Sequence, residues 1–475
     1  MPFRETDPVS EPKILLFRPA LLTALALVLA TTGCASVTRS HYAAPELPVA
    51  ATWDQAAQGV AGTAGAPWWN AFGDPGLTTL VDQVLAANAD LAAAGLRLKQ
   101  AHLSAEQARQ GLFPSGTASL STDASKALQG GSAWSKSSAA SLGVSWELDL
   151  FGRLGAAADA AQWEARASAQ DLAETRLSLI ATTAEAWWQL GYANEQVAIG
   201  EQSLAYVRRA LELVQRQYDA GAVSRLELRD AQQSVAAQES AQTQLVQARV
   251  SALKTIAALL DQQSYNGTEL MVLPAQPLPE IAAGVPASLL SRRPDLAAAE
   301  LRLRKTLATS DATVASYYPS FSLTGALGAA SSSLLKFFSN PAASLGAALS
   351  LAELNPEKVR LGTGIARADY DIAVQDFRQT FYDALRDTQV SLSAREQYVK
   401  QGRFAQANYE AARDAEALYA RQYRAGAIPL RDWLDAQERL RTARTGLIQN
   451  RYNQLVAQVA VYQALGGDPA DATAP

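Results

Sequence analysis

The sequence predicts a mostly helical membrane protein of the α+β class, in which one unit of helix, β-hairpin, long helix, tight turn and helix occurs twice. Three observations lead to this fold class. The chain of 475 residues matches itself after a shift of 205 residues. Each copy contains two segments that alternate between apolar and small polar residues, which is the pattern of transmembrane β-strands. Each copy also contains helical stretches far longer than a globular core requires.

The internal duplication has one register and no gap. It relates roughly residues 77–260 to residues 282–465. The matching pairs include Asp90–Ala94 with Asp295–Ala299, Arg216–Tyr218 with Arg421–Tyr423, and Ala220–Ala222 with Ala425–Ala427. The period exceeds the ~20–50 residues of solenoid repeats, so each copy is a whole assembly and not one tile of an array. We therefore expect a first repeat at 67–281, a second repeat at 282–466 and a flexible C-terminal tail at 467–475.

Composition argues against two classes of protein. The net charge is −5 and the pI is about 5.4. Because no long basic run accompanies this acidic balance, nucleic acid is not an expected partner. Outside the N-terminus no uninterrupted apolar stretch reaches ~18 residues, so a bundle of membrane-spanning helices is not expected either.

The N-terminal residues form a targeting segment. Lys13 and Arg18 precede an apolar run at 20–30 that is too short to span a bilayer. The run leads to Thr-Thr-Gly-Cys-Ala-Ser, which resembles a bacterial lipoprotein signal that is cut before the Cys. We expect residues 1–33 to be the signal peptide. We expect Cys34 to carry the lipid, with palmitate among its acyl chains. The alternative is an ordinary secretory signal followed by an incidental Cys.

Cys34 is the single Cys of the chain, so no disulfide and no Cys-based metal site is possible. In bacterial lipoproteins an Asp directly after the Cys retains the protein at the inner membrane. Ala35 stands there instead, which favours the outer membrane. Residues 34–66 are rich in Ala, Pro, Gly and Thr, and we expect them to form an extended arm behind the anchor.

Two segments in each copy have the period of two that gives a strand one apolar and one polar face. In the first copy the run Leu142–Leu150 places an apolar residue at every second position, with Gly, Ser, Glu and Asp between them. The second copy repeats this alternation at Phe321–Leu327 and Leu345–Leu351. We expect β-hairpins at about 115–150 and 320–352.

Long helices follow each predicted hairpin. Over 153–219 no Pro occurs, and the composition is dominated by Ala, Leu, Gln, Glu and Arg, which favour helix. At 1.5 Å per residue this helix is on the order of 100 Å long. Gly221 breaks it, and a second helix of roughly 55 Å returns over 224–260. A shorter helix over about 77–111 precedes the strands and ends at a Phe-Pro pair.

The four predicted strands are too few to close a barrel. Backbone in contact with lipid must be fully hydrogen-bonded, and the smallest single-chain barrels use about eight strands. The chain is therefore expected to oligomerise and to share one barrel among at least two copies.

Four motifs in this order resemble the TolC-like outer-membrane efflux proteins, the outer membrane factor lipoproteins of the NodT, OprM and CusC type. The motifs are Trp68–Leu77, Asn88–Leu91, Trp146–Arg153 and Arg293–Glu300. The resemblance covers residues 34–466 and rests on the combination, since no single motif suffices. Glu353–Glu357 departs from it, because relatives carry a Phe-Asp-Gly-Gly-type junction at this point.

The resemblance implies a homotrimer whose twelve pooled strands form one outer-membrane β-barrel, continued by a periplasmic α-barrel of twelve helices. It implies the exit duct of a tripartite efflux pump, which passively conducts substrates handed over by an inner-membrane transporter through a periplasmic adaptor. The RND type is the first candidate for the transporter, and the cargo does not follow from the sequence. We expect the protein in the bacterial outer membrane, lipid-anchored, with a large periplasmic portion.

The rival function is a lipid-anchored periplasmic coiled-coil scaffold or adaptor without a pore. Such a scaffold has no use for four strands with an apolar face. An enzyme is not expected, because the two His residues, His41 and His102, lie in the arm and on a helix and do not suggest a triad or a metal site. No phosphate-binding loop occurs, and no cofactor or metal is expected.

The predicted turns at 218–225 and 423–430 are the tips of the helical hairpins. A Gly in each turn allows the positive φ that reverses a helix. A plain reversal does not need Arg-Gln-Tyr before the Gly and Asp-Ala-Gln after it in both copies. By resemblance the tips form the periplasmic mouth, and the residues expected to contact the adaptor are Gly221, Ala222, Gly426 and Ala427.

By the same resemblance, acidic residues ring the constriction of this mouth. Asp432 and Asp435 lie three residues apart at the start of the return helix, hence on one face. In a trimer they supply six carboxylates, which attract cations. Their alternative role is a favourable interaction with the helix dipole, worth ~0.3–1 kcal/mol. Glu227 also fits a capping box with Ser224, and Asp230 is the first-copy equivalent of Asp435.

Tyr423 and Arg421 complete the predicted gate. Each can hold the mouth shut by a hydrogen bond to a neighbouring helix. A role at the surface without such a bond is the alternative for both residues.

Overall fold

The computed structural model describes residues 38–48, 67–126, 133–281, 292–331, 341–351 and 353–467. The predicted signal peptide at 1–33 and Cys34 lie outside these residues. So do residues 35–37 and 49–66 of the predicted arm and nearly all of the predicted tail.

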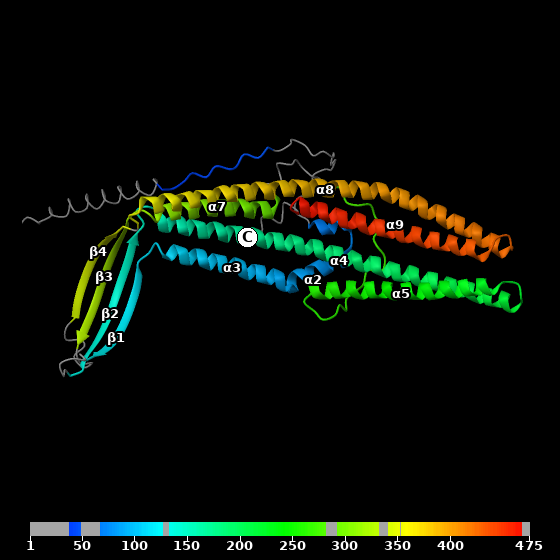
Figure 1. Cartoon of the computed structure of the whole chain (residues 1–475), viewed down its shortest axis with the longest axis horizontal. Helices are drawn as coiled ribbons and strands as arrows, with labels where there is room; N and C mark the ends of the chain where they lie inside the picture. The colour runs from blue at the N-terminus through cyan, green and yellow to red at the C-terminus, as the bar shows by residue number, and fades with distance from the viewer. Residues whose placement is uncertain are drawn as a thin grey trace, which may run out of the picture. The chain divides into compact units, whose positions relative to one another are not determined.

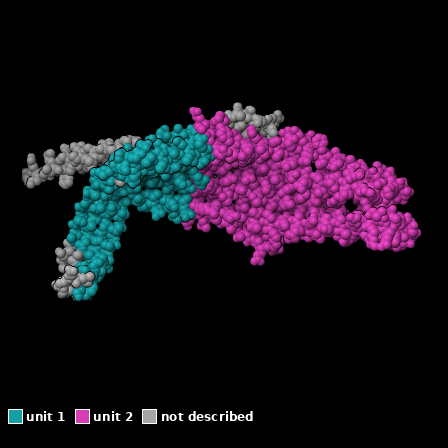
Figure 2. Space-filling view, viewed as in Figure 1, with its two compact units in different colours: residues 1–45, 100–166, 301–376 teal, residues 46–99, 167–300, 377–475 magenta. Residues whose placement is uncertain are grey.

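The chain divides into two compact units, which are coloured separately in Figure 2. Unit 1 comprises residues 1–45, 100–166 and 301–376, and unit 2 comprises residues 46–99, 167–300 and 377–475. Each unit takes segments from both predicted repeats. A repeat is therefore not a separate compact body, and the two copies are interleaved along the fold.

The helices and strands repeat in the same order in the two halves of the chain (Figure 1). The first half has η2 Trp68–Phe72, α2 Pro75–Ala87, α3 Ala89–Gln110, β1 Ser115–Ser125, β2 Ser135–Leu148, α4 Arg153–Asp219 and α5 Arg225–Leu259. The second half has α7 Pro294–Ala315, β3 Ser320–Ser331, β4 Pro341–Ser350, α8 Pro356–Arg424 and α9 Leu430–Ala464. After a shift of 205 residues, α3 coincides with α7 and α5 coincides with α9 at both ends. The duplication is thus one of structure as well as of sequence.

The predicted single helix over 77–111 is wrong, because the structure divides it at Asn88 into α2 and α3. Asn88 has extended backbone angles, with φ −68° and ψ 125°. Its side-chain amide donates to the Leu259 carbonyl at 3.0 Å, and its Oδ1 accepts from the Leu91 N–H at 3.1 Å. Asn88 therefore caps the start of α3 and ties it to the end of α5.

Unit 1 contains a four-stranded antiparallel sheet in the order β1-β2-β3-β4 (Figure 1). The register pairs Leu142 of β2 with Leu327 of β3. It also pairs Ser145 of β2 with Thr324 of β3, and each of these residues lies three positions along its strand from the leucine of the first pair. Because side chains alternate across a strand, the two pairs lie on opposite faces. The sheet has one face rich in large apolar side chains and one of mainly Ser, Thr and Gly, which confirms the predicted alternation.

Polar contacts fix the junction between β2 and α4. Asp149 accepts hydrogen bonds from the N–H groups of Leu154 and Gly155 at 2.9 and 2.6 Å, so it satisfies free donors at the helix N-terminus. Arg153 donates to both carboxylate oxygens of Glu147, at 2.8 and 2.9 Å. These contacts hold the last residues of the strand against the first turn of the helix.

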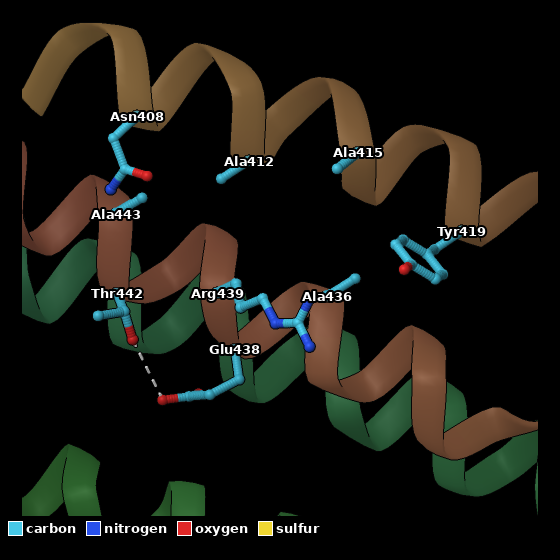
Figure 3. A pocket seen from close by; sticks show the side chains of 9 residues that line it. All are labelled: Asn408, Ala412, Ala415, Tyr419, Ala436, Glu438, Arg439, Thr442 and Ala443. Atoms are coloured by element: carbon cyan, nitrogen blue, oxygen red, sulfur yellow. Dashed lines mark hydrogen bonds between the residues drawn. The ribbon is translucent and has the colours of Figure 1, made fainter. Parts of the chain in front are cut away.

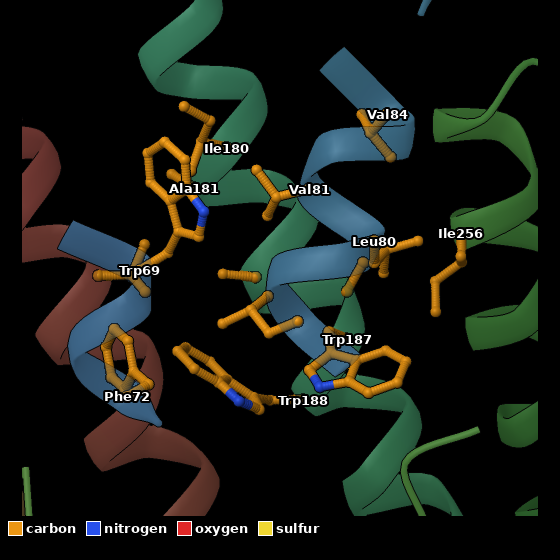
Figure 4. Close-up of a cluster of buried hydrophobic side chains, with 14 of the residues drawn as sticks. Trp69, Phe72, Leu80, Val81, Val84, Ile180, Ala181, Trp187, Trp188 and Ile256 are labelled. Atoms are coloured by element: carbon orange, nitrogen blue, oxygen red, sulfur yellow. The ribbon is translucent and has the colours of Figure 1, made fainter. Parts of the chain in front are cut away.

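A hydrophobic core of unit 2 surrounds Trp187 and Trp188 of α4 (Figure 4). Trp188 is fully buried, with its ring centroid 4.7 Å from that of Phe72 in η2. Trp187 donates from Nε1 to the Asp74 carboxylate at 2.8 Å. Gly76 packs against the Trp187 ring, where an added Cβ would come within 2.6 Å of it. The two Trp residues therefore pack helices against one another.

Asp261 is the only non-glycine residue with a positive φ in the described chain, at +57°. It follows the end of α5 at the position where Gly466, at +84°, follows the end of α9. Asp261→Gly should raise the free energy of unfolding by up to about 1 kcal/mol, because only Gly adopts this conformation freely. Gly466→Asp should lower it strongly, since an added Cβ would clash with the Arg292 carbonyl. Denaturant titration of the purified protein checks both, and equal effects would contradict this reasoning.

Candidate functional site

The candidate site comprises the two hairpin tips of unit 2, where α4 turns into α5 and α8 turns into α9. At the first tip Gly221 has φ +72°, and its N–H donates to the Tyr218 carbonyl at 2.9 Å. The Ala222 N–H donates to the Gln217 carbonyl at 2.8 Å. The second tip repeats both bonds, and Gly426 has the same φ of +72°. A residue with positive φ ends a helix in this way, and the open space around both Gly residues shows that conformation, not crowding, requires them.

An aromatic stack holds the second tip. Tyr423 of α8 stacks on Trp433 of α9, with ring centroids 5.0 Å apart and planes 23° from parallel. Trp433 also meets Tyr206 of α4 edge-on at 5.1 Å. The Tyr423 hydroxyl donates to Gln217 Oε1 on α4, 3.1 Å away. Trp433 is 8% exposed, so it is a buried link among three helices near their ends.

Glu416 is the polar partner of this stack. Its Oε1 accepts the Trp433 indole N–H at 3.0 Å and also a hydrogen bond from the side-chain amide of Gln437. Burial raises the pKa of Tyr206, and the charge of Glu416 raises it further. Burial likewise raises the pKa of Tyr423. Both phenols therefore stay protonated at neutral pH and remain able to donate.

The first tip is packed differently. Leu228 occupies the position equivalent to Trp433, and Tyr218 occupies the position equivalent to Tyr423. Leu228 is buried in the same cluster, but Tyr218 is 37% exposed. Two turns with the same backbone geometry thus carry one packed tyrosine and one exposed tyrosine.

The predicted gate carboxylates lie on the two return helices. Asp432 and Asp435 are exposed on α9, and Asp230 is exposed on α5. Glu227 is half-buried, and its backbone N–H donates to Ser224 Oγ at 3.3 Å, which is one half of the predicted capping box. The three Asp side chains are therefore open to solvent, whereas the segment of Glu227 has a structural role at the helix start.

Arg421 donates from Nε to the Ala417 carbonyl of its own helix, 3.2 Å away. The predicted bond from Arg421 to a neighbouring helix is not formed in this structure, so Arg421 has the alternative surface role here. Tyr423 does form such a bond, to Gln217. The residues predicted to contact an adaptor are all exposed, namely Gly221, Ala222, Gly426 and Ala427.

A groove of about 400 Å³ lies between α8 and α9, a few turns from the second tip (Figure 3). Ala412 and Ala415 of α8 line one side, and α9 forms the other. Thr442 of α9 donates to Glu438 at 3.4 Å beside it. Sequence reasoning missed this groove. Its signal is the series of small residues on the two helices, which leaves room between them.

The described residues hold no group of three or more His, Cys, Asp or Glu side chains placed to bind a metal ion. Among the helices that the structure describes, none combines the length and the apolar character needed to cross a bilayer.

Comparison with known proteins agrees with the repeated architecture. The family model for the outer membrane efflux protein matches residues 80–262 and matches again at residues 285–467. The second match is displaced from the first by the same 205 residues as the internal duplication. The chain belongs to the outer membrane efflux protein family.

Relatives match this efflux protein over most of its length. It is 32% identical over 412 residues to the pyoverdine export outer membrane protein OpmQ of Pseudomonas aeruginosa, covering 84% of this chain and 87% of OpmQ. It is 30% identical over 455 residues to the antibiotic efflux pump outer membrane protein ArpC of Pseudomonas putida, covering 92% and 93% of the two chains. The solved structure of the outer-membrane channel OprN has a TM-score of 0.80 and 29% identity, over 90% of this chain and 98% of that one.

The predicted resemblance to outer-membrane efflux proteins is confirmed by these matches. The family is one of transport channels that work in efflux, not a family of enzymes. The roles assigned above to single tip residues of the efflux protein stay predictions.

Proposed function

We propose that this efflux protein is the exit duct of a tripartite pump. Three copies, each with a four-stranded sheet, pool twelve strands into one outer-membrane β-barrel and twelve helices into a periplasmic tunnel. A periplasmic adaptor joins the tunnel to an inner-membrane transporter, for which the RND type is the first candidate, and the transporter supplies the energy. Relatives named for pyoverdine export and for antibiotic efflux fit a duct that conducts different cargoes without selecting among them.

The sheet of unit 1 is the observation that carries this proposal. Its apolar face exposes large side chains, with Leu142 63%, Leu327 60% and Leu345 95% exposed. Such a face suits the hydrocarbon of a bilayer, and the opposite face of Ser, Thr and Gly suits a water-filled lumen. Within the described sheet β1 and β4 each pair on one side only. Unpaired strand edges are not tolerated in lipid, so neighbouring copies are the natural source of the remaining pairing.

Helix α8 offers a second surface for neighbouring copies. Val390, Phe404 and Leu418 follow one another at intervals of 14 residues on this helix, and they are 61%, 76% and 54% exposed. Residues two heptads apart lie on one face of a helix in a coiled wall. This apolar stripe supports packing of α8 against a helix of the next copy.

The groove between α8 and α9 supports an adaptor contact near the tips. Its alanine side chains leave space for the ridge of an incoming helix, and Glu438 and Arg439 at its border offer polar partners. Gly426 and Ala427 at the turn are exposed as well. A helix that lies in a groove with small side chains is a common mode of recognition between proteins.

Asp432 and Asp435 are proposed to ring the mouth of the trimer. Replacing both by Asn should lower the preference for cations over anions several-fold in planar-bilayer recordings, because carboxylates are removed from a narrow pore. The control is Glu410→Gln combined with Asp414→Asn, which removes the same charge from an exposed stretch of α8. Unchanged selectivity in the Asp432 and Asp435 variant would remove both residues from the constriction.

Heat modifiability separates the duct from the rival coiled-coil scaffold. If the protein is the duct, the outer membrane should contain an oligomer of it that resists SDS without heating. Boiling should dissociate this oligomer to a chain of 50.5 kDa or less. Cross-linking of that oligomer should end at three copies, and it should give ion-conducting steps in a planar bilayer. If the protein is a periplasmic scaffold, it should instead be an elongated, SDS-sensitive particle without conductance. That outcome would contradict the proposed duct function.

A further inference from the structure

The arm segment Thr38–Tyr42 is bound to the rest of unit 1 through four of its residues. Thr38 Oγ1 donates to the Phe151 carbonyl at 2.6 Å, and Arg39 forms an ion pair with Asp159 at 3.0 Å. Ser40 donates hydrogen bonds to Asp311. The Arg304 guanidinium lies over the Tyr42 ring, 4.2 Å from its centroid. Phe151 and Asp159 lie just before and inside the start of α4, and Arg304 and Asp311 lie on α7. The segment therefore connects a helix of the first repeat with a helix of the second.

Asp311 is the strongest of these attachment points. It is 8% exposed, and both of its carboxylate oxygens accept from Ser40, Oδ2 from the backbone N–H at 2.9 Å and Oδ1 from Oγ at 2.7 Å. A buried carboxylate is unfavourable unless hydrogen bonds satisfy it, and bonds to a charged group are about twice as strong as neutral ones. The Arg39–Asp159 pair is half exposed and adds little. Release of the segment would thus deprive Asp311 of two hydrogen-bond donors.

The internal duplication does not give the chain a second copy of this binding site. A shift of 205 residues relates Asp311 to Glu106 and Asp159 to Gly364. Glu106 is exposed on α3, and Gly364 has no side chain to pair with an arginine. Each chain thus has one arm and one site, although every helix that forms the site has a counterpart in the other repeat.

We propose that Thr38–Tyr42 is a strap, and that its attachment to Asp311 sets the depth of the N-terminal lipid anchor relative to the junction of β2 and α4. Cys34 precedes Thr38 by four residues, a distance that an extended chain spans with at most about 14 Å. With Thr38 bound to the Phe151 carbonyl, the anchor lies within that reach of the point where the sheet gives way to helices. The anchor itself rests on the lipidation of Cys34 that the sequence predicts, whereas binding of the strap does not.

Trypsin measures release of the strap, because the bond between Arg39 and Ser40 should be cleaved much faster once the segment has left its site and can enter the active site of the protease. In the purified full-length protein, Asp311→Asn should speed cleavage after Arg39 about tenfold or more, since charge-assisted hydrogen bonds are lost. Ser40→Ala changes no helix residue and should act in the same direction. Glu106→Gln, the equivalent change in the other repeat, should leave the rate unchanged. The cleaved product is identified by its intact mass.

Cleavage after Arg39 that is equally fast in the wild-type, Asp311→Asn and Ser40→Ala proteins would overturn the strap. Equal acceleration by Glu106→Gln would overturn the special role of Asp311. Either outcome leaves the duct function standing, because conductance and heat modifiability are measured separately.

The depth-setting role has its own test. An insertion of about six Gly and Ser residues between Val37 and Thr38 more than doubles the reach of the anchor. It should lower the amount of SDS-resistant oligomer in the outer membrane several-fold, whereas the same insertion between Ala51 and Thr52 should not. Equal effects of the two insertions would overturn the role in depth. Labelling of the wild-type and Cys34→Ser proteins with palmitate reports on the anchor independently.

Discussion

Trp433→Ala should weaken the second hairpin tip by about 3–5 kcal/mol, the usual cost of deleting a buried Trp side chain. The change removes the stack on Tyr423, the edge contact with Tyr206 and the indole hydrogen bond to Glu416. Local opening of the tip becomes more frequent as a result. Hydrogen exchange of the backbone amides at this tip should accelerate by about 100-fold or more, since each 1.4 kcal/mol is a factor of about ten.

The effect on transport follows from the helices that Trp433 joins. It links α9 to Tyr423 of α8 and to Tyr206 of α4, so it couples the second hairpin to the first. Without it, the mouth proposed at the tips should open more often. Planar bilayers should show a higher open fraction, and cells should become sensitive to large antibiotics that the outer membrane normally keeps out.

Tyr218→Ala is the matched control, because Tyr218 has the position of Tyr423 in the first copy but is exposed. It should change the stability of its own tip by less than about 0.5 kcal/mol. Unaltered exchange at the second tip of Trp433→Ala would show that the stack does not hold this tip.

The stack also has a defined dependence on pH. The folded-state pKa of Tyr206 and that of Tyr423 both lie above the unfolded value of about 10. Their contribution to stability is therefore complete below pH 10 and is lost as the pH rises toward the folded-state values. Between pH 6 and pH 9 the exchange difference between wild-type and Trp433→Ala proteins should stay constant, after correction for the intrinsic rate.

A single arginine on the apolar face of the sheet should prevent assembly. Leu142 lies within β2, an inner strand of the sheet, and is 63% exposed on that face. Arginine facing lipid near the middle of the bilayer costs about 2–4 kcal/mol at each site, and the proposed trimer has three such sites. Leu142→Arg should leave little SDS-resistant oligomer when outer membranes are analysed by gel electrophoresis without heating.

Ser145→Arg is the control for Leu142→Arg, since Ser145 lies three residues along the same strand and on the opposite face. An arginine there would face the proposed lumen, so the oligomer should form and its conductance should change. If both variants assemble, or if both fail, the assignment of the two faces is wrong.

The helices and strands could be predicted where the local sequence pattern defines them. The predicted limits of the long helix at Arg153 and Asp219 are the limits of α4, because a run of helix-favouring residues ends just before Gly221. The strands were predictable because alternation defines their two faces without reference to any partner. Asn88 escaped prediction because its amide bonds to Leu259, which no local pattern reveals.

The contacts within the candidate site were beyond sequence reasoning for the same reason. Tyr423 reaches Gln217 across 206 positions of the chain. Ser40 reaches Asp311 across 271 positions. Periodicity tells which side of a helix is covered, but not which neighbour covers it. The turn residues, by contrast, could be named in advance because a positive φ is a property of one residue.

The correspondence of α3 with α7 and of α5 with α9 at both ends limits how this protein can change its length during evolution. One residue added inside an α-helix rotates all that follows by about 100°. An insertion in α4 ahead of Gln217 would turn that amide away from Tyr423, while the other hairpin kept its orientation. Insertions and deletions should therefore accumulate in the connecting loops, and the long helices should diverge by substitution alone.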